Sequence, residues 1–573
     1  ITCNGKTFMN NKPCEPTDGA HYIAHSLKQL GVSHVFFMDA ILRPTLVLME
    51  EHGIIRILAH SEKSAAYMAD GYARITNRVG VCLAQSVGAA NLAAGLQDAY
   101  LHRAPLVAMT GRKEPMLRHR NAYQEVSHTP LFSSTTKDSI DVAEARELPH
   151  LLAQAFRTAT DGSPGPVHLD LNGLGGEILE KGKVPNPTLP DATLGHLPEH
   201  RPLASPEMIA AATARLAKAK RPVLVVGTGA IQVGAHDEIK QLAEKLSIPI
   251  ATSLGGRTIV PTTHPLHIGT VGTYSAPPGN LLVFNADLVI YIGCHAGDQP
   301  TNNYKVPAPG TPIIQIDLDG QEIGRNYPNT TVVWGCPRQA VTDLAAANEQ
   351  VVGWSDWAKH AAAVVAEWRA GLASLATSDT PPITVERLCH EISQALPKNG
   401  ILVADTGYSG IWTATLLDLP HEGQSYLRAA GSLGWAFPAA LGAQCGAPDR
   451  PVVCFSGDGA FYYHLSELET QRRWNLPVVT VINNNSGFGQ GTQKIASFYQ
   501  GREGGNPEEI NRFGPTNFAA IARNFGIEGI RIEDPADLAL ALTRAIAARK
   551  PVLLDVITDI HPRAPEAWEP PAA

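Results

Sequence analysis

The sequence predicts an α/β protein made of three doubly wound, mostly parallel-sheet domains. Short apolar runs alternate with amphipathic stretches of helical pattern, which is typical of parallel sheets covered by helices on both faces. This alternation recurs in three blocks of similar size and class, at residues 18–180, 205–350 and 383–560. Four further segments complete the predicted organisation: an N-terminal arm at 1–17, a proline-rich linker at 181–204, an alanine-rich linker helix at 351–382 and a tail at 561–573, extended or acting as a cover.

Composition narrows the class of protein. A chain of 573 residues with 44% hydrophobic and 17% charged residues is long enough for several cores and indicates a soluble globular protein. The net charge of −8 and the lack of a basic block argue against a nucleic-acid partner. The eight cysteines form no CxxC pair, which disfavours a zinc site or a disulfide framework. No apolar run could span a membrane and residues 1–17 lack a signal-peptide core, so we expect a cytoplasmic protein without a membrane partner.

The third block contains a strand-turn-helix-strand unit around "GDGAFYYHLSELETQRRWNLPVVTVINNN" (457–485). Its pattern predicts strands at 452–455 and 478–482 and a helix at 464–474. Such a crossover makes the two strands parallel, so their carboxyl ends share one edge of the sheet. We therefore expect Asp458 and Asn485 at the edge where open α/β sheets bind ligands.

The residue types at this edge suit a hard divalent cation. Asp458 offers a carboxylate, Asn485 an amide oxygen and Gly487 a backbone oxygen, the ligand atoms that Mg²⁺ prefers. A helix starting near Phe461 would direct free N–H groups and its positive dipole end at a phosphate. The alternative is a tight GDG turn and an unrelated asparagine loop. The placement of Asn485 one helix and one strand after Asp458 favours the metal site.

The same stretch resembles the cofactor signature of thiamine-diphosphate enzymes: GDG, a spacer, then NN. The resemblance extends over most of the chain and implies pyrimidine-binding, central and diphosphate-binding domains in that order. It implies that Asp458, Asn485 and the Gly487 carbonyl bind Mg²⁺, which holds the diphosphate of the cofactor. It adds the other residues of the turn to the cofactor site: Gly457, Gly459 and Ala460.

Two further segments of the third block resemble parts of the family site. "DTGYSG" (405–410) is similar to a loop that contacts the diphosphate, with Ser409 as the best candidate. "GSLGWAFPAALGAQ" is similar to the segment that holds the cofactor rings in a V shape. The resemblance implies that Leu433 lies under the cofactor and that the Gly431 carbonyl receives its 4′-amino group. An ordinary core leucine is the alternative for Leu433.

Glu62 follows a strand and precedes a helix in the first block. A glutamate there can simply cap the helix or favour its dipole. However, "AHSEKSAAYMADGYARI" resembles the family segment whose glutamate acts on N1′ of the aminopyrimidine, activating the cofactor as carbon nucleophile and electron sink. In the family, the cofactor lies between the first block of one subunit and the third block of another. The resemblance thus implies a homodimer or homotetramer with the active site at the subunit interface.

The branch is indicated by "SVGAANLAAGLQDAYLHRAPLVAMTGR", "NAYQEV" and "TPIIQIDLDGQEIGRNYP". They resemble the branch of acetolactate synthases, 2-keto-acid decarboxylases and 2-hydroxyacyl-CoA lyases. Gln124 falls on the family glutamine that approaches cofactor and substrate, an exposed loop residue being the alternative. Tyr123 and His128 are candidate pocket residues, although a surface histidine is common.

Two features bear on cofactors and substrate access. In the central block, Gly227 and Gly229 give a weak nucleotide signal, and "CHAGDQPTNNYKVP" lacks the arginine-rich pattern of flavin-containing relatives. We therefore expect thiamine diphosphate and Mg²⁺, with FAD or ADP as the less favoured addition. Residues 487–515 have the composition of a mobile active-site cover, in which Gln490, Thr492 and Gln493 could meet the substrate; a solvated loop is the alternative.

Together these motifs predict a thiamine-diphosphate- and Mg²⁺-dependent enzyme that makes or breaks a carbon–carbon bond adjacent to a carbonyl. Its expected small-molecule substrates are 2-keto acids, by acetolactate synthase-like decarboxylation and carboligation. One alternative is a 2-hydroxyacyl-CoA or oxalyl-CoA lyase, although no basic tail supports CoA binding. The other is a non-catalytic cofactor-binding paralogue, which need not have kept Glu62, Asp458 and Asn485 together.

Overall fold

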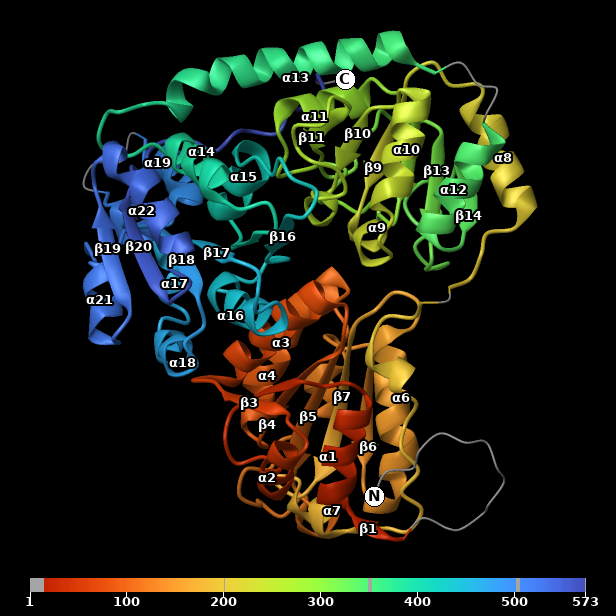
Figure 1. Cartoon of the computed structure of the whole chain (residues 1–573), viewed down its shortest axis with the longest axis vertical. Coiled ribbons are helices and arrows are strands. Elements are labelled where there is room, and N and C mark those ends of the chain that lie inside the picture. Colours follow the sequence, from red (N-terminus) through yellow and green to blue (C-terminus); the bar gives the residue numbers. More distant parts are fainter. Residues whose placement is uncertain (1–14, 200, 349–352, 501–504, 572–573) are drawn as a thin grey trace. The chain divides into compact units, whose positions relative to one another are not determined.

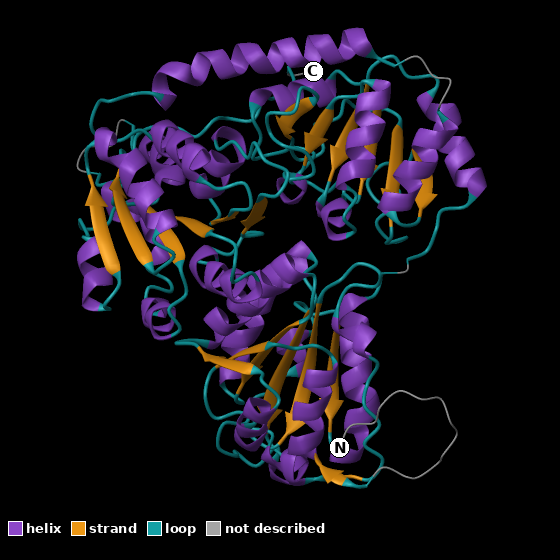
Figure 2. Ribbon diagram, in the orientation of Figure 1, coloured by secondary structure: helices purple, strands orange, loops and turns teal. Residues whose placement is uncertain are grey.

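The computed structural model describes residues 15–199, 201–348, 353–500 and 505–571. Its internal contacts divide the chain into two compact units. The first holds the described residues up to Ala66 together with Arg78–Leu96 and Pro105–Leu197. The second holds Tyr67–Asn77, Gln97–Ala104 and the described residues from Pro198 onward. Three six-stranded sheets carry helices on both faces (Figures 1 and 2), which confirms the predicted α/β class.

The first unit contains the sheet drawn in red to orange in Figure 1, with all six strands parallel in the order β3-β2-β4-β5-β7-β6. Strands β4, β5 and β7 are buried at every residue, as expected for a parallel sheet covered on two faces. A short antiparallel pair joins β1 (Thr17–Asp18) to β8 (Lys183–Val184). The strands are β2 (His34–Phe37), β3 (Ile55–Leu58), β4 (Gly80–Ala84), β5 (Leu106–Arg112), β6 (Asp138–Val142) and β7 (Pro166–Asn172). The helices of this first block are α1 (Gly19–Gln29), α2 (Arg43–Glu51), α3 (Glu62–Thr76), α4 (Gly88–His102), α5 (Thr129–Phe132), α6 (Leu148–Thr160) and α7 (Glu177–Lys181). Of these, α3 and α4 begin in the first unit and end in the second.

The central sheet has the order β11-β10-β9-β12-β13-β14, which reverses between β9 and β12. This is the 3-2-1-4-5-6 order known from dinucleotide-binding folds. Its strands are β9 (Pro222–Val226), β10 (Ile250–Thr252), β11 (His267–Thr270), β12 (Leu288–Ile292), β13 (Ile313–Asp317) and β14 (Thr330–Trp334). The helices of this part are α8 (Pro206–Leu216), α9 (Thr228–Gln232), α10 (His236–Leu246), α11 (Pro277–Phe284), α12 (Pro337–Ala347) and the long α13 (Ser355–Ala376).

The glycine pair of the central block lies at this reversal. A Cβ atom on Gly227 would come 2.2 Å from the Gly293 carbonyl oxygen, and one on Gly229 would come 3.0 Å from the Gly293 Cα. Close packing of the β9 turn against the end of β12 therefore explains both glycines. They do not by themselves indicate a bound nucleotide, and the expectation on FAD and ADP stays a prediction.

The third sheet, in blue-green to blue in Figure 1, has the order β16-β15-β17-β18-β20-β19 with all strands parallel. The order reverses between β15 and β17. Its strands are β15 (Ile401–Ala404), β16 (Ser425–Arg428), β17 (Val452–Gly457), β18 (Val478–Asn484), β19 (Glu528–Ile532) and β20 (Val552–Ile557). Its helices are α14 (Val385–Ala395), α15 (Tyr408–Leu416), α16 (Ala436–Gly446), α17 (Asp458–Phe461), α18 (Glu467–Arg473), α19 (Thr492–Phe498), α20 (Glu508–Asn511), α21 (Phe518–Asn524) and α22 (Pro535–Ala547).

The predicted crossover unit is present, with one correction. Strands β17 and β18 pair in parallel, Val452 opposite Val478, as the sequence predicted. The helix between them is shorter than the expected 464–474, because α18 spans only Glu467–Arg473. A separate single turn, α17, begins at Asp458 instead of near Phe461. The expectation of a helix starting near Phe461 was therefore wrong, and phosphate binding at this turn stays a prediction.

The segments outside the sheets are also defined. The boundary between the units, at Leu197, falls in the predicted linker at 181–204, while the exact domain limits stay predictions. Residues 561–571 form neither helix nor strand, and the Asn280 side chain donates a hydrogen bond to the Trp568 carbonyl at 3.1 Å. Residues 1–14 of the predicted arm and 572–573 of the tail lie outside the described residues.

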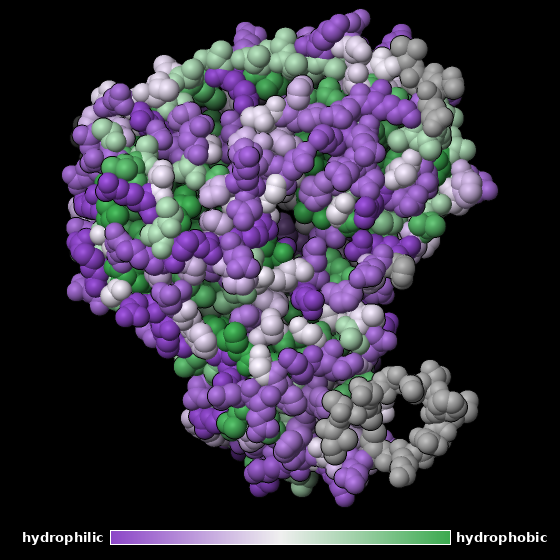
Figure 3. All heavy atoms as spheres, viewed as in Figure 1, coloured by the Kyte–Doolittle hydropathy of each residue, from purple (hydrophilic) through white to green (hydrophobic). Residues whose placement is uncertain are grey.

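Polar residues cover most of the face shown in Figure 3, where apolar residues appear in scattered areas. Among the helices that the structure describes, none is both long enough and apolar enough to cross a membrane.

Candidate functional site

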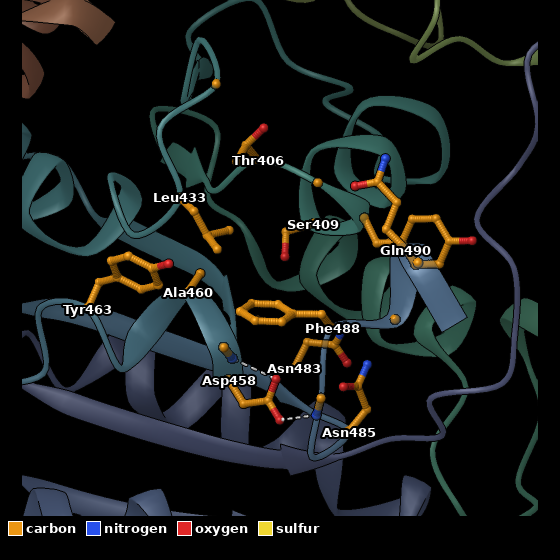
Figure 4. Close-up of a pocket in the computed structure, with 18 of the residues that line it drawn as sticks. Thr406, Ser409, Leu433, Asp458, Ala460, Tyr463, Asn483, Asn485, Phe488 and Gln490 are labelled. Atoms are coloured by element: carbon orange, nitrogen blue, oxygen red, sulfur yellow. Dashed lines mark hydrogen bonds between the residues drawn. The ribbon is translucent and has the colours of Figure 1, made fainter. Parts of the chain in front are cut away.

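A cavity of about 660 Å³ opens at the carboxyl edge of the third sheet, entirely within the second unit. Turns that follow β15, β17 and β18 supply most of its wall (Figure 4). All the third-block residues that the sequence nominated for cofactor binding line this one cavity: Ser409, Gly431, Leu433, Gly457, Asp458, Gly459, Ala460, Asn485 and Gly487. The structure thus brings these nine candidates together, while their roles stay predictions.

Asp458 is the first residue of α17 and its side chain is 2% exposed. Its carboxylate accepts hydrogen bonds from the backbone N–H groups of Gly459 at 2.7 Å and of Gly487 at 3.1 Å (Figure 4). Burial raises the pKa of the Asp458 carboxyl to about 6, against the effect of these backbone donors. The main influences on this pKa are burial and four backbone donors, with no cationic side chain among them to compensate the charge. A cation bound beside it would supply that compensation.

Asn485 carries a second oxygen of interest in this cavity. Its side-chain oxygen is buried and accepts no hydrogen bond from the described residues, an unusual state for a buried acceptor. An unpartnered amide oxygen and a buried carboxylate in one cavity form a donor set that fits Mg²⁺. For Gly487 the structure gives the N–H contact to Asp458; the use of its carbonyl as a ligand stays a prediction.

Two glycines at this edge, one in the GDG turn and one after β18, are required by close contacts. A Cβ atom on Gly459 would lie 2.5 Å from the Phe488 ring, and one on Gly487 would lie 2.4 Å from the Asn511 carbonyl oxygen. The turn between β17 and α17 therefore presents backbone instead of side chains to the cavity. Backbone N–H groups in such a turn suit a phosphate, although the single turn of α17 adds little dipole.

The loop from 429 to 436 is held by two buried carboxylates. Asp98 accepts hydrogen bonds from the N–H groups of Ala430 at 2.9 Å and of Ser432 at 3.0 Å, and Asp405 accepts from Gly434 at 3.0 Å. Burial raises the pKa of Asp405 to about 6. Between these anchors, the half-buried Leu433 lies on the cavity wall (Figure 4) and not in the core, which removes the core-leucine alternative.

Several wall residues were not nominated as cofactor ligands. Thr406, Tyr408 and Asn483 lie inside motifs that the sequence had already marked, and Gln490 was a candidate for substrate contact. Tyr274 is different, because it comes from the central block and no local pattern links it to the third. The remaining members are Gly407, Tyr463, Phe488, Gly489 and Gly491.

Glu62 is the first residue of α3, in the first unit. The helix cap is Ser61, whose hydroxyl accepts the Ser64 N–H at 3.0 Å. The Glu62 carboxylate accepts a hydrogen bond from the Asn91 amide at 3.2 Å, and a Cβ atom on Gly88 would come 2.4 Å from it. Since Ser61 performs the capping, the cap interpretation of Glu62 is wrong, while its place in the first turn of α3 still suits the helix dipole. The carboxylate is turned toward the start of α4 and remains partly exposed.

Gln124, the second catalytic candidate, also belongs to the first unit and adopts a left-handed backbone with φ 58°. Its side-chain oxygen accepts a hydrogen bond from the Gln85 amide at 2.6 Å, and its carbonyl accepts one from the Ser86 hydroxyl at 2.7 Å. These bonds set the conformation of Gln124, so it is more than a solvated loop residue. Neither Glu62 nor Gln124 lines the cavity of the second unit.

Three doubly wound sheets and a glycine-lined cavity with buried oxygen ligands are the features of a cofactor-binding α/β protein. Family models of thiamine pyrophosphate enzymes match the chain in three stretches: the N-terminal TPP binding domain at residues 17–131, the central domain at 209–344 and the C-terminal TPP binding domain at 405–556. Because these matches span well over half of its length, the chain belongs to the thiamine pyrophosphate enzyme family.

Full-length relatives agree with this assignment and with the predicted branch. A probable acetolactate synthase large subunit of Methanococcus aeolicus is 31% identical over 583 residues, covering 97% of this chain and 94% of that protein. The acetolactate synthase isozyme 2 large subunit of Escherichia coli is 30% identical over 95% of this chain and 96% of its own. The acetolactate synthase large subunit of Lactococcus lactis is 28% identical over 95% and 93%.

Proposed function

We propose that the chain is a thiamine-diphosphate- and Mg²⁺-dependent enzyme that makes or breaks a carbon–carbon bond next to a carbonyl. Its proposed substrates are 2-keto acids, used in acetolactate synthase-like decarboxylation and carboligation. The observation that carries the proposal is the cavity in which a buried Asp458 and an unpartnered Asn485 oxygen lie beside a glycine-lined turn. The relatives named as acetolactate synthases support the choice of reaction.

The cavity residues would hold the cofactor as follows. Asp458, Asn485 and the Gly487 carbonyl would bind Mg²⁺, and the carbonyl of Gly431 with the side chain of Leu433 would contact the organic rings. The diphosphate would meet the turn residues and one hydroxyl: Gly457, Gly459, Ala460 and Ser409. When bound, thiamine diphosphate supplies an electron sink for carbanion chemistry.

The remaining chemistry falls to side chains of the first unit. Glu62 would share a proton with the aminopyrimidine, its carboxylate oriented by the Asn91 amide and by the close approach of Gly88. Gln124 would contact the substrate. We further propose a homodimer or homotetramer in which the first block of one subunit meets the third block of another, each active site lying at that interface.

Turnover assays test this function directly. Pyruvate, longer 2-keto acids, 2-hydroxyacyl-CoA and oxalyl-CoA are each incubated with the protein, thiamine diphosphate and Mg²⁺, with Glu62→Gln as the matched control. We expect release of CO₂ and a coupled product from 2-keto acids only, and strong loss in the control. Turnover of the thioesters alone would assign a CoA lyase. Tight cofactor binding without any turnover would assign a non-catalytic paralogue.

A further inference from the structure

A buried polar cluster lies in the first unit behind the Gln124 loop. It contains His128, His168 and Asp170, whose exposed fractions are 2%, 0% and 5%, together with the buried Thr110. The sheet register explains the grouping: Thr110 on β5 is paired with Asp170 on β7, and His168 lies two residues before Asp170, on the same face. His128 reaches this face from the residue before α5.

His128 bridges two segments of the unit. Its Nδ1 lies 2.8 Å from Asp170 Oδ1 and its Nε2 lies 3.0 Å from the Ser86 carbonyl oxygen. The ring therefore faces a carboxylate with one nitrogen and a backbone carbonyl with the other. The imidazole is thereby fixed at two points, one on β7 and one just after the end of β4. The guanidinium of Arg112 lies 3.8 Å from the other side of the Asp170 carboxylate and shares in orienting it.

The segment that His128 fixes is the one that contacts Gln124. The Ser86 hydroxyl donates to the Gln124 carbonyl at 2.7 Å, and the Gln85 amide donates to its side-chain oxygen at 2.6 Å. The left-handed conformation of Gln124 is unfavourable for a residue with a Cβ atom. Bonds from outside the loop are therefore needed to hold it, and they come from Gln85 and Ser86. This segment is itself held by the Leu174 carbonyl, by the start of α4 and by His128.

We propose that His128 is a positioning residue for Gln124. Asp170 fixes one side of the His128 ring, and the other side holds the 85–86 segment through the bond to the Ser86 carbonyl. In that position, Gln85 and Ser86 set the left-handed conformation of Gln124. The proposal rests on the proposed function in one respect, namely that Gln124 contacts the substrate. The structural part of the proposal, that His128 orders the Gln124 loop, stands independently of the reaction.

A metal ion is the competing explanation, since one ligand atom from each of the three residues lies within 4.8 Å of the others. The separations argue against it. His128 and Asp170 are 2.8 Å apart, and Thr110 Oγ1 and His168 Nε2 are 2.7 Å apart, whereas ligands of tetrahedral zinc with bonds of about 2.0 Å lie about 3.3 Å apart. The outer nitrogen of His168 is also engaged, by Ser139 at 2.8 Å. The cluster is a closed hydrogen-bond network.

Two variants separate the two contacts of His128. His128→Gln places an amide nitrogen near the position of Nε2 and can keep the bond to the Ser86 carbonyl. His128→Asn places one near Nδ1 and keeps only the bond to Asp170. We expect kcat on the proposed 2-keto acid substrates to fall by as much as about 100-fold in His128→Asn, since small misplacements of a reacting group have that effect. His128→Gln should retain most of the activity, and the KM for thiamine diphosphate should stay unchanged in both.

His168→Asn is the matched control for damage to the cluster. This ring is as deeply buried and contacts Thr110, but it does not contact Ser86. Burial lowers the pKa of His168 well below its ordinary value, so a neutral amide replaces a neutral ring. We expect a lower melting temperature and an unchanged kcat when the variant is assayed well below that temperature.

Hydrogen–deuterium exchange of the peptide covering residues 118–128 gives a readout that does not depend on turnover. His128→Asn, and Ser86→Ala if the first variant does not fold, should exchange faster there than the wild type, while His168→Asn should not. If no 2-keto acid is turned over, the proposed function is wrong. In that case the exchange measurement alone decides whether His128 positions the Gln124 loop. Wild-type exchange and wild-type kcat in His128→Asn would overturn the proposal, as would one equivalent of a metal by elemental analysis that disappears in that variant.

Discussion

The first and third sheets share one topology and carry different chemistry at the same edge. Counted in chain order within each sheet, both have the strand order 2-1-3-4-6-5. In the third sheet, the turn after its third strand is glycine-rich, contains the buried Asp458 and opens into a cavity. In the first sheet, the corresponding turn carries Gln85 and Ser86, whose side chains hold Gln124. The shared topology puts a turn at the same position of both sheets. The size and polarity of the residues in that turn decide whether it opens into a cavity or supports a neighbouring loop.

The two proposed acids differ in the same way. Asp458 is 2% exposed, held by backbone N–H groups and left without a cationic partner among the described residues. Glu62 is partly exposed and is oriented by a neutral amide beside Gly88. The edge of the third sheet is therefore suited to a charged ligand. The edge of the first sheet presents a carboxylate that, in the proposed function, acts on a neutral ring. The following predictions test this contrast between the two edges.

The largest effect is expected at Glu62. Glu62→Gln keeps the size of the side chain and a hydrogen-bonding amide but cannot share a proton with the aminopyrimidine. General acid–base participation is worth about 10²–10⁴-fold in rate, so turnover should fall by that factor while thiamine diphosphate and Mg²⁺ still bind. C2 proton exchange of the bound cofactor, followed by NMR after quenching, should slow in parallel. Rapid C2 exchange in this variant would falsify the role assigned to Glu62.

Asp458→Ala should act on binding instead of chemistry. Removing one partner of a buried charge pair costs about 3–5 kcal/mol, so the cofactor dissociation constant in Mg²⁺ should rise by two to three powers of ten or more. Calorimetric titration with thiamine diphosphate measures this directly, and excess cofactor should restore part of the activity. A wild-type dissociation constant would show that the metal lies elsewhere.

Cofactor affinity should depend on pH through Asp458. Its folded pKa, about 6, lies above the ordinary value of 3.8. In the absence of a cation its contribution to stability is therefore present below pH 3.8 and is lost as pH rises through about 6. Cation binding needs the ionised form, so affinity should be constant above pH 7 and fall about tenfold per pH unit below pH 6. Calorimetric titrations with the cofactor from pH 5 to 8 check this. The Asp458→Asn variant is the control, because its pH dependence reports only the titration of the cofactor itself. Equal slopes of affinity against pH in the two proteins would contradict the assignment.

Asn485→Ala removes a neutral oxygen and should weaken cofactor binding less than Asp458→Ala. A lost ligand of this kind costs about 1–2 kcal/mol, or roughly tenfold in the dissociation constant. The same calorimetry provides the measurement, with Asn483→Ala, another asparagine of the cavity wall, as a comparison at a site not assigned to the metal. An effect of Asn485→Ala as large as that of Asp458→Ala would contradict the ranking of charged and neutral ligands.

The smallest effect is expected at the central sheet, where we expect little or no bound flavin. Because close packing against Gly293 explains Gly227 and Gly229, no flavin is needed to account for that turn. The purified protein should be colourless or carry flavin well below one equivalent, measured by visible absorbance after denaturation. A full equivalent of FAD would contradict this prediction and would mean that the protein binds a second cofactor.

Much of the site could be predicted from the sequence because it depends on local pattern. The apolar runs before Asp458 and Asn485 marked two strands, and the crossover rule then placed both residues at one edge. The length of the intervening helix was predicted less well: α17 and α18 are two short helices where the residue pattern indicated one. The capping role of Ser61 was also missed, since sequence pattern alone does not say whether Ser61 or Glu62 faces the first turn of α3.

By itself, the sequence determined the three α/β blocks and the residues that end at the sheet edges, because strand periodicity and crossover geometry act over short stretches of chain. Only the tertiary structure decided the state of those residues. Among the described residues it left the Asn485 oxygen without a partner, it raised the pKa of the Asp458 carboxyl to about 6 by burial, and it used Asp98 to hold the loop that begins at Ala430. The Asp98–Ala430 contact joins residues 332 positions apart, and burial and hydrogen bonding depend on which distant groups the fold brings within about 3 Å.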